Sequence, residues 1–147
     1  MLKEERVVDI LLVEDNPGDV ELTQEAFEGS KFRNKLHVAR DGDEALDFFY
    51  KRGDFVDAVT PDVVLLDLNL PKTDGREVLA LMKSDEAFKD LPVIVLTSSQ
   101  MDRDVLEKFD LPSNCYIVKP IDLSQFFKAL KHLDGIWVDI IQSFERK

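Results

Sequence analysis

The sequence predicts an α/β fold: a doubly wound sheet of five parallel strands, each followed by a helix. Short apolar runs alternate with longer amphipathic segments along the 147 residues. The third and fourth runs are apolar without alternation, which is typical of strands that helices cover on both faces. The length fits one domain, and no repeat or internal linker divides it. These observations favour a single βα-repeating domain over a sandwich.

The strands are predicted from short runs of valine, isoleucine and leucine bounded by charged or turn residues. Val63-Val64-Leu65-Leu66 and Val93-Ile94-Val95-Leu96 are the clearest of them. Such runs are far below the ~20 apolar residues that a membrane-spanning helix needs, so no membrane association is predicted. In chain order the predicted strands are Val7–Val13, Leu36–Ala39, Asp62–Leu66, Pro92–Leu96 and Cys115–Val118.

A helical segment follows each predicted strand. Asn16 can cap the first helix, with Pro17 at the first helical position, which is a favoured combination at helix starts. The third helix follows Gly75 and the fifth follows Pro120. Apolar residues at helical spacing mark one face of each segment. They are Val20 and Phe27; Ala45, Leu46, Phe48 and Phe49; Val78, Leu79, Leu81 and Met82; Val105, Leu106 and Phe109; and Leu123, Phe126, Phe127 and Leu130.

The charge balance is strongly acidic. Asp and Glu outnumber Lys and Arg by 30 to 19, for a formal net charge of −11. Because no basic run offsets this charge, we expect neither nucleic acid nor an anionic membrane surface as a partner. The single cysteine, Cys115, cannot form an intramolecular disulfide, and the charged N-terminus does not resemble a signal peptide. A cytoplasmic location is therefore expected.

Polar side chains gather where the predicted strands end. The carboxyl ends of parallel strands share one edge of a sheet, and functional sites lie beyond that edge. Three carboxylates within about 5 Å would repel by roughly 3 kcal/mol per pair at an effective dielectric near 20, so such a cluster requires a cation or a shifted protonation state. Mg²⁺, which prefers oxygen ligands, is the simplest candidate. The residues concerned are Glu14 and Asp15, Asp67 and Asn69, Thr97, and Lys119.

Four short motifs at these strand ends resemble the signature of CheY-like response regulator receiver domains. The resemblance covers roughly residues 7–132, and the motifs occur in the family's order and at its separations. It implies the flavodoxin-like receiver fold with strand order 2-1-3-4-5. The motifs are Leu12-Val13-Glu14-Asp15-Asn16, Leu65-Leu66-Asp67-Leu68-Asn69-Leu70-Pro71, Leu96-Thr97-Ser98 and Val118-Lys119-Pro120.

The resemblance implies that Asp67 is the phosphoacceptor, whose carboxylate attacks the phosphorus of a phosphohistidine on a partner. Mg²⁺ would be held by Asp15, Asp67 and the backbone carbonyl of Asn69, with Glu14 reaching it through water. The first acid of the pair is Glu14 where the family commonly has Asp, which lengthens its reach. The protein would thus catalyse only its own phosphotransfer and autodephosphorylation and would not be an enzyme otherwise.

The same resemblance implies a conformational switch. Lys119 would pair with Asp67 and then with the phosphate. Thr97 would hydrogen-bond a phosphoryl oxygen and draw the loop after the fourth strand inward. Tyr116 would then turn into the vacated space.

Finer features resemble the regulators that accompany bacterial and cyanobacterial phytochromes. They are the segments 67–79 and 114–120 and the extended tail. The expected partner is a sensor histidine kinase, with a phytochrome as the specific possibility, or a phosphotransfer protein.

We expect a receiver domain over residues 1–133 and a helical extension over 134–147, with no output domain. The extension carries an apolar stripe that requires burial. It either folds back on its own domain or helps form a homodimer through the fourth and fifth helices and the fifth strand. The stripe consists of Ile136, Trp137, Ile140, Ile141 and Phe144.

Three other functions fit parts of the pattern. A haloacid-dehalogenase-type phosphatase also uses a strand-end aspartate, but its Asp-x-Asp-x-Thr pattern is not met, because Asn69 stands at the second position. A flavodoxin-like cofactor binder would have a Ser-, Thr- and Gly-rich loop after the first strand, where Glu14 and Asp15 would repel phosphate. A receiver-like binding module that works without phosphorylation is the third alternative, and retention of the complete residue set argues against it.

Overall fold

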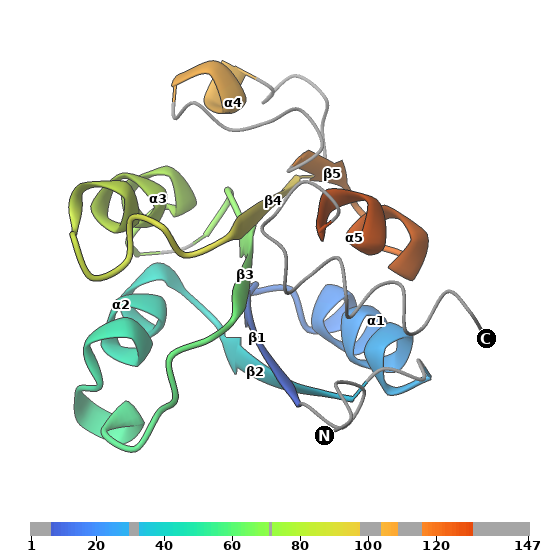
Figure 1. Ribbon diagram of the computed structural model, residues 1–147, viewed down its shortest axis with the longest axis horizontal. Coiled ribbons are helices and arrows are strands. Elements are labelled where there is room, and N and C mark those ends of the chain that lie inside the picture. The colour runs from blue at the N-terminus through green and yellow to red at the C-terminus, as the bar shows by residue number, and fades with distance from the viewer. Residues whose placement is uncertain (1–6, 30–32, 71, 98–103, 109–115, 131–147) are drawn as a thin grey trace, which may run out of the picture.

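The computed structural model has five parallel strands in one sheet, in the order β2-β1-β3-β4-β5. The predicted doubly wound fold and its strand order are therefore confirmed (Figure 1). The structure describes residues 7–29, 33–70, 72–97, 104–108 and 116–130. The strands are β1 (Val8–Val13), β2 (Asn34–Ala39), β3 (Val63–Asp67), β4 (Val93–Thr97) and β5 (Tyr116–Val118).

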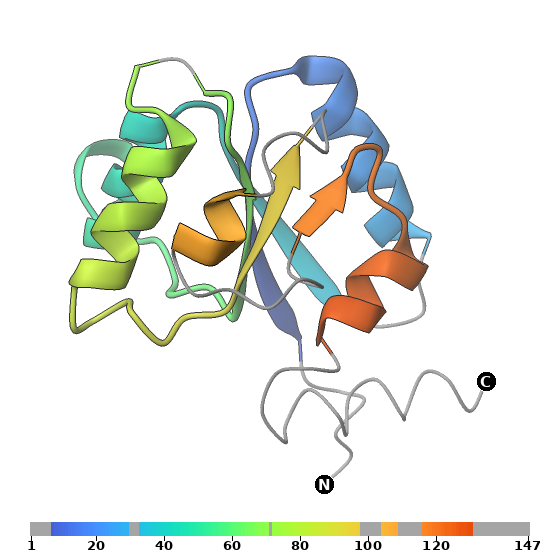
Figure 2. The ribbon, with the colours of Figure 1, turned by 90° about the horizontal axis from the view of Figure 1, so that it is seen from above.

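The described ranges contain five α-helices and one 3₁₀ turn, and all but α5, which follows the last strand, lie between strands. The helices α2 and α3 cover one face of the sheet, and α1 and α5 cover the other (Figures 1 and 2). Within the described ranges, no helix combines the length and apolar character that crossing a bilayer requires. The elements are α1 (Pro17–Glu28), α2 (Gly42–Tyr50), the 3₁₀ turn η2 (Gly53–Phe55), α3 (Gly75–Ser84), α4 (Asp104–Lys108) and α5 (Leu123–Leu130).

The core consists of two apolar layers, one on each side of the sheet. Every residue of β3 and β4 is buried, as expected for central strands covered on both faces. On the α1–α5 side, the rings of Phe27 and Phe126 pack edge to face with centroids 4.8 Å apart. On the α2–α3 side, Phe48 and Phe49 pack with residues of α3 and the sheet. Burial of both layers holds the strand ends in fixed positions.

Side-chain caps determine where three of the helices begin. The Asn16 side chain accepts a hydrogen bond from the Asp19 backbone N–H at 3.0 Å, and Pro17 is the first residue of α1, as predicted. Asp41 caps α2 and Asp74 caps α3 in the same way, and neither cap was predicted. These caps place the helix N-termini on the side of the sheet where the strands end.

Some element bounds differ from the predicted ones. Asp67 and Thr97 are the last residues of β3 and β4, not the first residues after them, because each still pairs with the neighbouring strand, Asp67 with Leu96 and Thr97 with Val118. Strand β2 begins at Asn34, two residues earlier than predicted. The turn η2 was not predicted. The expectations for Ser98, Phe109, Cys115 and the extension over 134–147 fall outside the described residues.

Gly75, the first residue of α3, lies directly against the backbone at the end of β3. A Cβ atom at this position would lie 2.6 Å from the Leu68 Cα and 2.8 Å from the Leu68 carbonyl oxygen. It would also overlap the carbonyl oxygen of Asp67. We therefore expect Gly75→Ala to lower the free energy of unfolding by about 1–3 kcal/mol, since the obstructing atoms are backbone. Urea denaturation monitored by circular dichroism measures this change.

Gly29→Ala is the matched control for that substitution. The nearest atom to a Cβ at Gly29 is the Glu25 carbonyl oxygen at 3.4 Å, and the residue has a φ of −78°, which alanine adopts readily. We expect a change below about 0.5 kcal/mol there, which is ordinary for a surface substitution. Equal changes in the free energy of unfolding for the two substitutions would show that the backbone around Gly75 shifts to accommodate a methyl group without loss of stability.

Candidate functional site

An open cavity of about 490 Å³ lies at the carboxyl edge of the sheet. It lies beside β1 and β3, next to the point where the winding direction of the sheet reverses, which is the usual place for a site in this architecture. The wall combines acidic residues from two strand ends with one lysine that follows β5. Its lining residues are Glu14, Asp15, Asn16, Asp19, Leu22, Asp67, Asn69, Lys119 and Pro120.

Three carboxylates meet in this cavity. Glu14, Asp15 and Asp67 each offer one oxygen, and these oxygens lie within 4.8 Å of one another. Glu14 and Asp67 are buried, whereas Asp15 is exposed. Backbone N–H groups hold the two buried carboxylates, because Asn16 donates to Glu14 Oε2 at 3.2 Å and Asn69 donates to Asp67 Oδ1 at 3.0 Å. Hard oxygen ligands beside an open space fit a divalent cation such as Mg²⁺ or Mn²⁺.

Lys119 supplies the positive charge that this cluster contains. Its Nζ lies 3.0 Å from Glu14 Oε1, 2.9 Å from Asp19 Oδ2 and 3.2 Å from Asp67 Oδ2. The Lys119 backbone N–H donates to the Thr97 carbonyl oxygen at 2.7 Å, which fixes the residue to the end of β4. Burial disfavours the charge on Lys119, but its carboxylate partners outweigh that effect and raise the pKa of the ammonium.

The pKa of Glu14 is higher than that of an ordinary glutamate side chain. The pKa of Glu14 is raised to about 7, mainly by burial and also by the neighbouring Asp67, while the hydrogen bond to Lys119 acts to lower it. Glu14 is therefore partly protonated at neutral pH. The proton relieves repulsion between the two buried carboxylates, and a bound cation would displace it.

Five of the predicted site residues line the cavity, namely Glu14, Asp15, Asp67, Asn69 and Lys119. The other two, Thr97 and Tyr116, lie outside the wall. Thr97 is fully buried at the end of β4. Tyr116 is half-buried at the start of β5 and packs against the core layer on the α2–α3 side.

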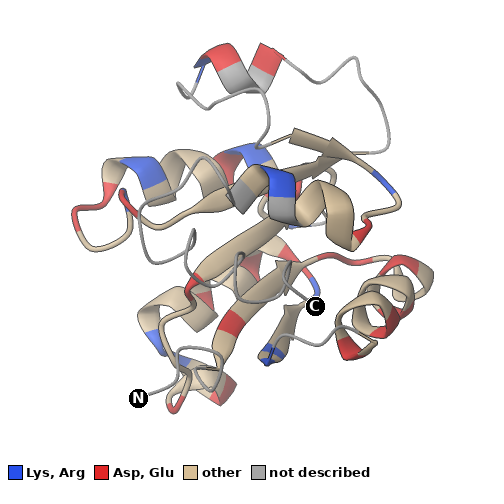
Figure 3. Ribbon diagram, turned by 45° about the vertical axis from the view of Figure 1, so that its right-hand side comes forward, with Lys and Arg blue, Asp and Glu red and all other residues tan. Residues whose placement is uncertain are grey.

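Asp19 is the charged site residue that sequence reasoning missed. It lies in the first turn of α1, and its carboxylate reaches Lys119 across a separation of 100 residues. One signal was available, because a residue three positions after the cap Asn16 lies on the first helical turn, next to the strand ends. In Figure 3 the ribbon of α1 is coloured for acidic residues and for no basic ones, so the helix that Lys119 contacts through Asp19 is acidic.

The comparisons with known proteins identify this arrangement. The sequence pattern of the family described as the response regulator receiver domain matches residues 10–131 of this chain. Response regulator Rcp1 of Synechocystis sp. is 40% identical over 132 residues, which are 90% of each chain. The solved Mn²⁺-bound form of Rcp1 has a TM-score of 0.71 and 38% identity, over 90% of this chain and 95% of that one.

Two further solved structures are similar. The bacteriophytochrome response regulator AtBRR has a TM-score of 0.78 and 45% identity, over 86% of this chain and 91% of that one. The phosphorylated cyanobacterial phytochrome response regulator RcpA has a TM-score of 0.71 and 44% identity, over 90% and 95%. Receiver-domain response regulators are generally signalling proteins and not enzymes. The chain therefore belongs to the CheY-like response regulator receiver family of two-component signalling.

Proposed function

We propose that this protein accepts a phosphoryl group on Asp67 from a histidine kinase or a phosphotransfer protein and signals by a change of conformation. The observation that carries the proposal is the buried Asp67 carboxylate, 3.2 Å from the Lys119 ammonium in the wall of an open cavity. A carboxylate oxygen of Asp67 would form the new bond to phosphorus as the phosphorus–nitrogen bond of the donor phosphohistidine breaks. The released histidine nitrogen keeps the electron pair of that bond.

The residues that would hold Mg²⁺ are Asp15, Asp67, the backbone carbonyl of Asn69 and, through water, Glu14. Three carboxylate oxygens within 4.8 Å support this assignment, as does the Mn²⁺ bound by the relative Rcp1. When bound, the ion would neutralise charge on the transferring phosphoryl oxygens. The backbone N–H groups of Asn16 and Asn69 keep the buried carboxylates oriented toward the cavity.

Three residues would read the phosphorylated state. Lys119 would pair with Asp67 and then with a phosphoryl oxygen. Thr97 would donate its hydroxyl to another phosphoryl oxygen, and Tyr116 would turn inward in response. The position of Thr97 at the end of β4 supports this, since its carbonyl oxygen already accepts the backbone N–H of Lys119. Thr97 at the end of β4 and Tyr116 in the adjacent strand β5 would thus be coupled through the hydrogen bonds between these strands.

The kinase would be a phytochrome. Support comes from two similar proteins that are named as response regulators of phytochromes. They are the bacteriophytochrome response regulator AtBRR and the cyanobacterial phytochrome response regulator RcpA. Phosphotransfer from a purified phytochrome kinase, compared under red and far-red light, tests this partner. Transfer that is equally slow from the phytochrome and from unrelated kinases would point to a different donor.

Residues 1–133 would form the receiver domain and 134–147 an extension. The extension, with α4, α5 and β5, would form a homodimer, and the apolar stripe from Ile136 to Phe144 supports this. Sedimentation of the full chain and of a chain ending at residue 133 tests the dimer. A monomer in both cases would exclude it.

The experiment that tests the phosphoacceptor function is incubation with acetyl phosphate and Mg²⁺, followed by intact mass measurement. We expect the addition of one phosphoryl group, and we expect a chelator to prevent it. Borohydride reduces the acyl phosphate, releases the phosphate and leaves homoserine in place of the phosphorylated aspartate, so fragmentation of the reduced protein should find homoserine at position 67. An unmodified protein, when another receiver is labelled in parallel, would exclude phosphorylation by small donors.

The affinity for Mg²⁺ should depend on pH through Glu14. Because the pKa of Glu14 is about 7, the ion must displace a proton below that pH and finds the carboxylate ionised above it. We expect the apparent affinity to rise about tenfold between pH 6 and pH 8 and to level off above that. Calorimetric titration in buffers of different ionisation enthalpy measures both the affinity and the proton released.

Glu14→Gln is the control for that pH dependence, because the amide does not titrate. Its Mg²⁺ affinity should be weaker and nearly independent of pH in the same range. An affinity of the unmodified protein that is flat from pH 6 to pH 8 would show that Glu14 is already ionised at pH 6.

A further inference from the structure

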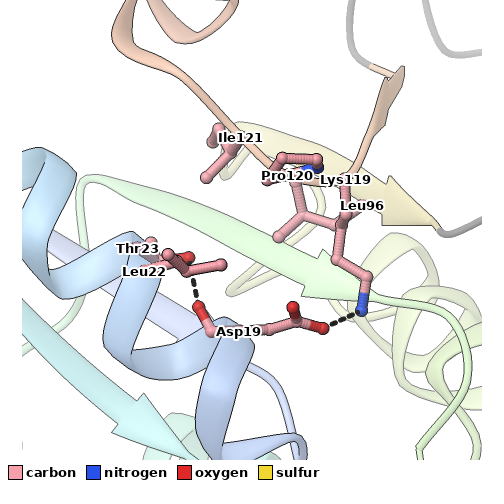
Figure 4. A pocket seen from close by; sticks show the side chains of 7 residues that line it. All are labelled: Asp19, Leu22, Thr23, Leu96, Lys119, Pro120 and Ile121. Atoms are coloured by element: carbon pink, nitrogen blue, oxygen red, sulfur yellow. Dashed lines mark hydrogen bonds and ion pairs between the residues drawn. The ribbon is translucent and has the colours of Figure 1, made fainter.

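All three N–H donors of Lys119 are engaged by carboxylates. A lysine ammonium has three donors and no more, and here they face Glu14, Asp19 and Asp67 at 2.9–3.2 Å. Figure 4 shows the Asp19 side chain extending from α1 toward the Lys119 nitrogen. Lys119 therefore has no donor to spare for a phosphoryl oxygen unless it releases one of these partners.

Burial indicates which partner can be released. The side chains of Glu14 and Asp67 are 1% and 3% exposed, so a bond lost there would leave a poorly hydrated carboxylate. The side chain of Asp19 is 30% exposed and also lines the open cavity of about 490 Å³, where water can replace the ammonium. Asp67 would keep one carboxyl oxygen beside the ammonium after its other oxygen carries the phosphoryl group. Asp19 is thus the partner that can be given up at least cost.

We propose that Asp19 is a positioning residue that holds Lys119 in the unphosphorylated protein and opposes its transfer to the phosphoryl group. The inference rests on the proposed function of Asp67. Two effects act in the same direction: the Asp19–Lys119 ion pair stabilises only the unphosphorylated arrangement, and the Asp19 carboxylate repels the added negative charge of the phosphoryl group. Asp19 therefore lowers the stability of the phosphorylated state.

Helix stabilisation is the competing explanation for Asp19. An acidic residue in the first turn of a helix interacts favourably with the N-terminal end of the helix dipole. The other contacts of Asp19 are made by its backbone, whose N–H donates to Asn16 Oδ1 and whose carbonyl oxygen accepts from Thr23 Oγ1. Those contacts survive a change of side chain. A role limited to the helix would alter thermal stability and leave the affinity for a phosphoryl group unchanged.

Beryllofluoride, which forms a complex with an aspartate carboxylate that mimics the aspartyl phosphate, tests the inference. We expect Asp19→Asn to bind beryllofluoride in the presence of Mg²⁺ about three- to fivefold more tightly than the unmodified protein, near the upper end of the range for one partly exposed ion pair. Asp19→Glu, which keeps the carboxylate, should remain close to the unmodified protein. Glu21→Gln is the matched control, because it removes one negative charge from an exposed position of the same helix and should change the affinity less than twofold.

Each result has a distinct meaning. Tighter binding by Asp19→Asn alone supports the inference. Affinity of Asp19→Asn equal to that of Glu21→Gln, or weaker than that of the unmodified protein, overturns it, because Asp19 would then be neutral or would orient Lys119 toward the phosphoryl group. If the unmodified protein takes up neither beryllofluoride nor a phosphoryl group from acetyl phosphate, the proposed function itself fails, and the inference fails with it.

Discussion

Asp67→Asn is expected to abolish phosphoryl incorporation from acetyl phosphate while the protein keeps its fold. The asparagine amide is not a nucleophile at neutral pH, and an acyl phosphate cannot form on it. Its side-chain oxygen can still accept the hydrogen bond that the Asn69 backbone N–H donates to Asp67 Oδ1. Intact mass measurement after incubation with Mg²⁺ and acetyl phosphate should show no added phosphoryl group.

The fold should survive because the substitution removes charge from a crowded site. Asp67 is 2% exposed and contributes to raising the pKa of Glu14. Without it, that pKa should move down toward its ordinary value of 4.5. Asp57→Asn, at an exposed position in the loop before β3, is the matched control and should be labelled fully. Labelling of Asp67→Asn to the extent of the control would mean that another residue is the acceptor.

The fold could be predicted because its signals are local. The central strands β3 and β4 are continuous apolar runs in the sequence and are buried along their whole length in the structure. The cap Asn16 with Pro17 likewise defines the start of α1 within a few residues. The caps Asp41 and Asp74 were missed because short polar residues are common in loops, and only the backbone conformation distinguishes a cap from a turn.

The site could be predicted only in part. Parallel topology brings Glu14, Asp15 and Asp67 to one edge, and no other information was needed to group them. The bond between Asp19 and Lys119 could not be derived in this way, because it depends on where the first turn of α1 lies relative to the residue that follows β5. The close approach of Gly75 to Leu68 is similarly a matter of packing at the scale of one methyl group, which residue types do not encode.

Lys119→Met is expected to destabilise the protein by about 3 kcal/mol at pH 8 in the absence of divalent cations. The methionine keeps an apolar stem but leaves the buried carboxylates of Glu14 and Asp67 without their cation. The cost should fall by about 1 kcal/mol at pH 6, because Glu14 can then take up a proton. Urea denaturation at both pH values, with a chelator present, measures the two free energies of unfolding.

The sign of this pH dependence follows from the two pKa shifts. Glu14 binds a proton more tightly in the folded protein, so its contribution to stability is complete below pH 4.5 and is lost as the pH rises through about 7. The raised pKa of Lys119 keeps its contribution constant between pH 6 and pH 8, so of these two groups Glu14 alone titrates in that window. Lys128→Met, at an exposed position of α5, is the matched control and should change stability by less than about 0.5 kcal/mol at either pH. A cost at Lys119 that is the same at pH 6 and pH 8 would mean that the carboxylates escape into solvent when the lysine is removed, and that the site is less enclosed than its burial indicates.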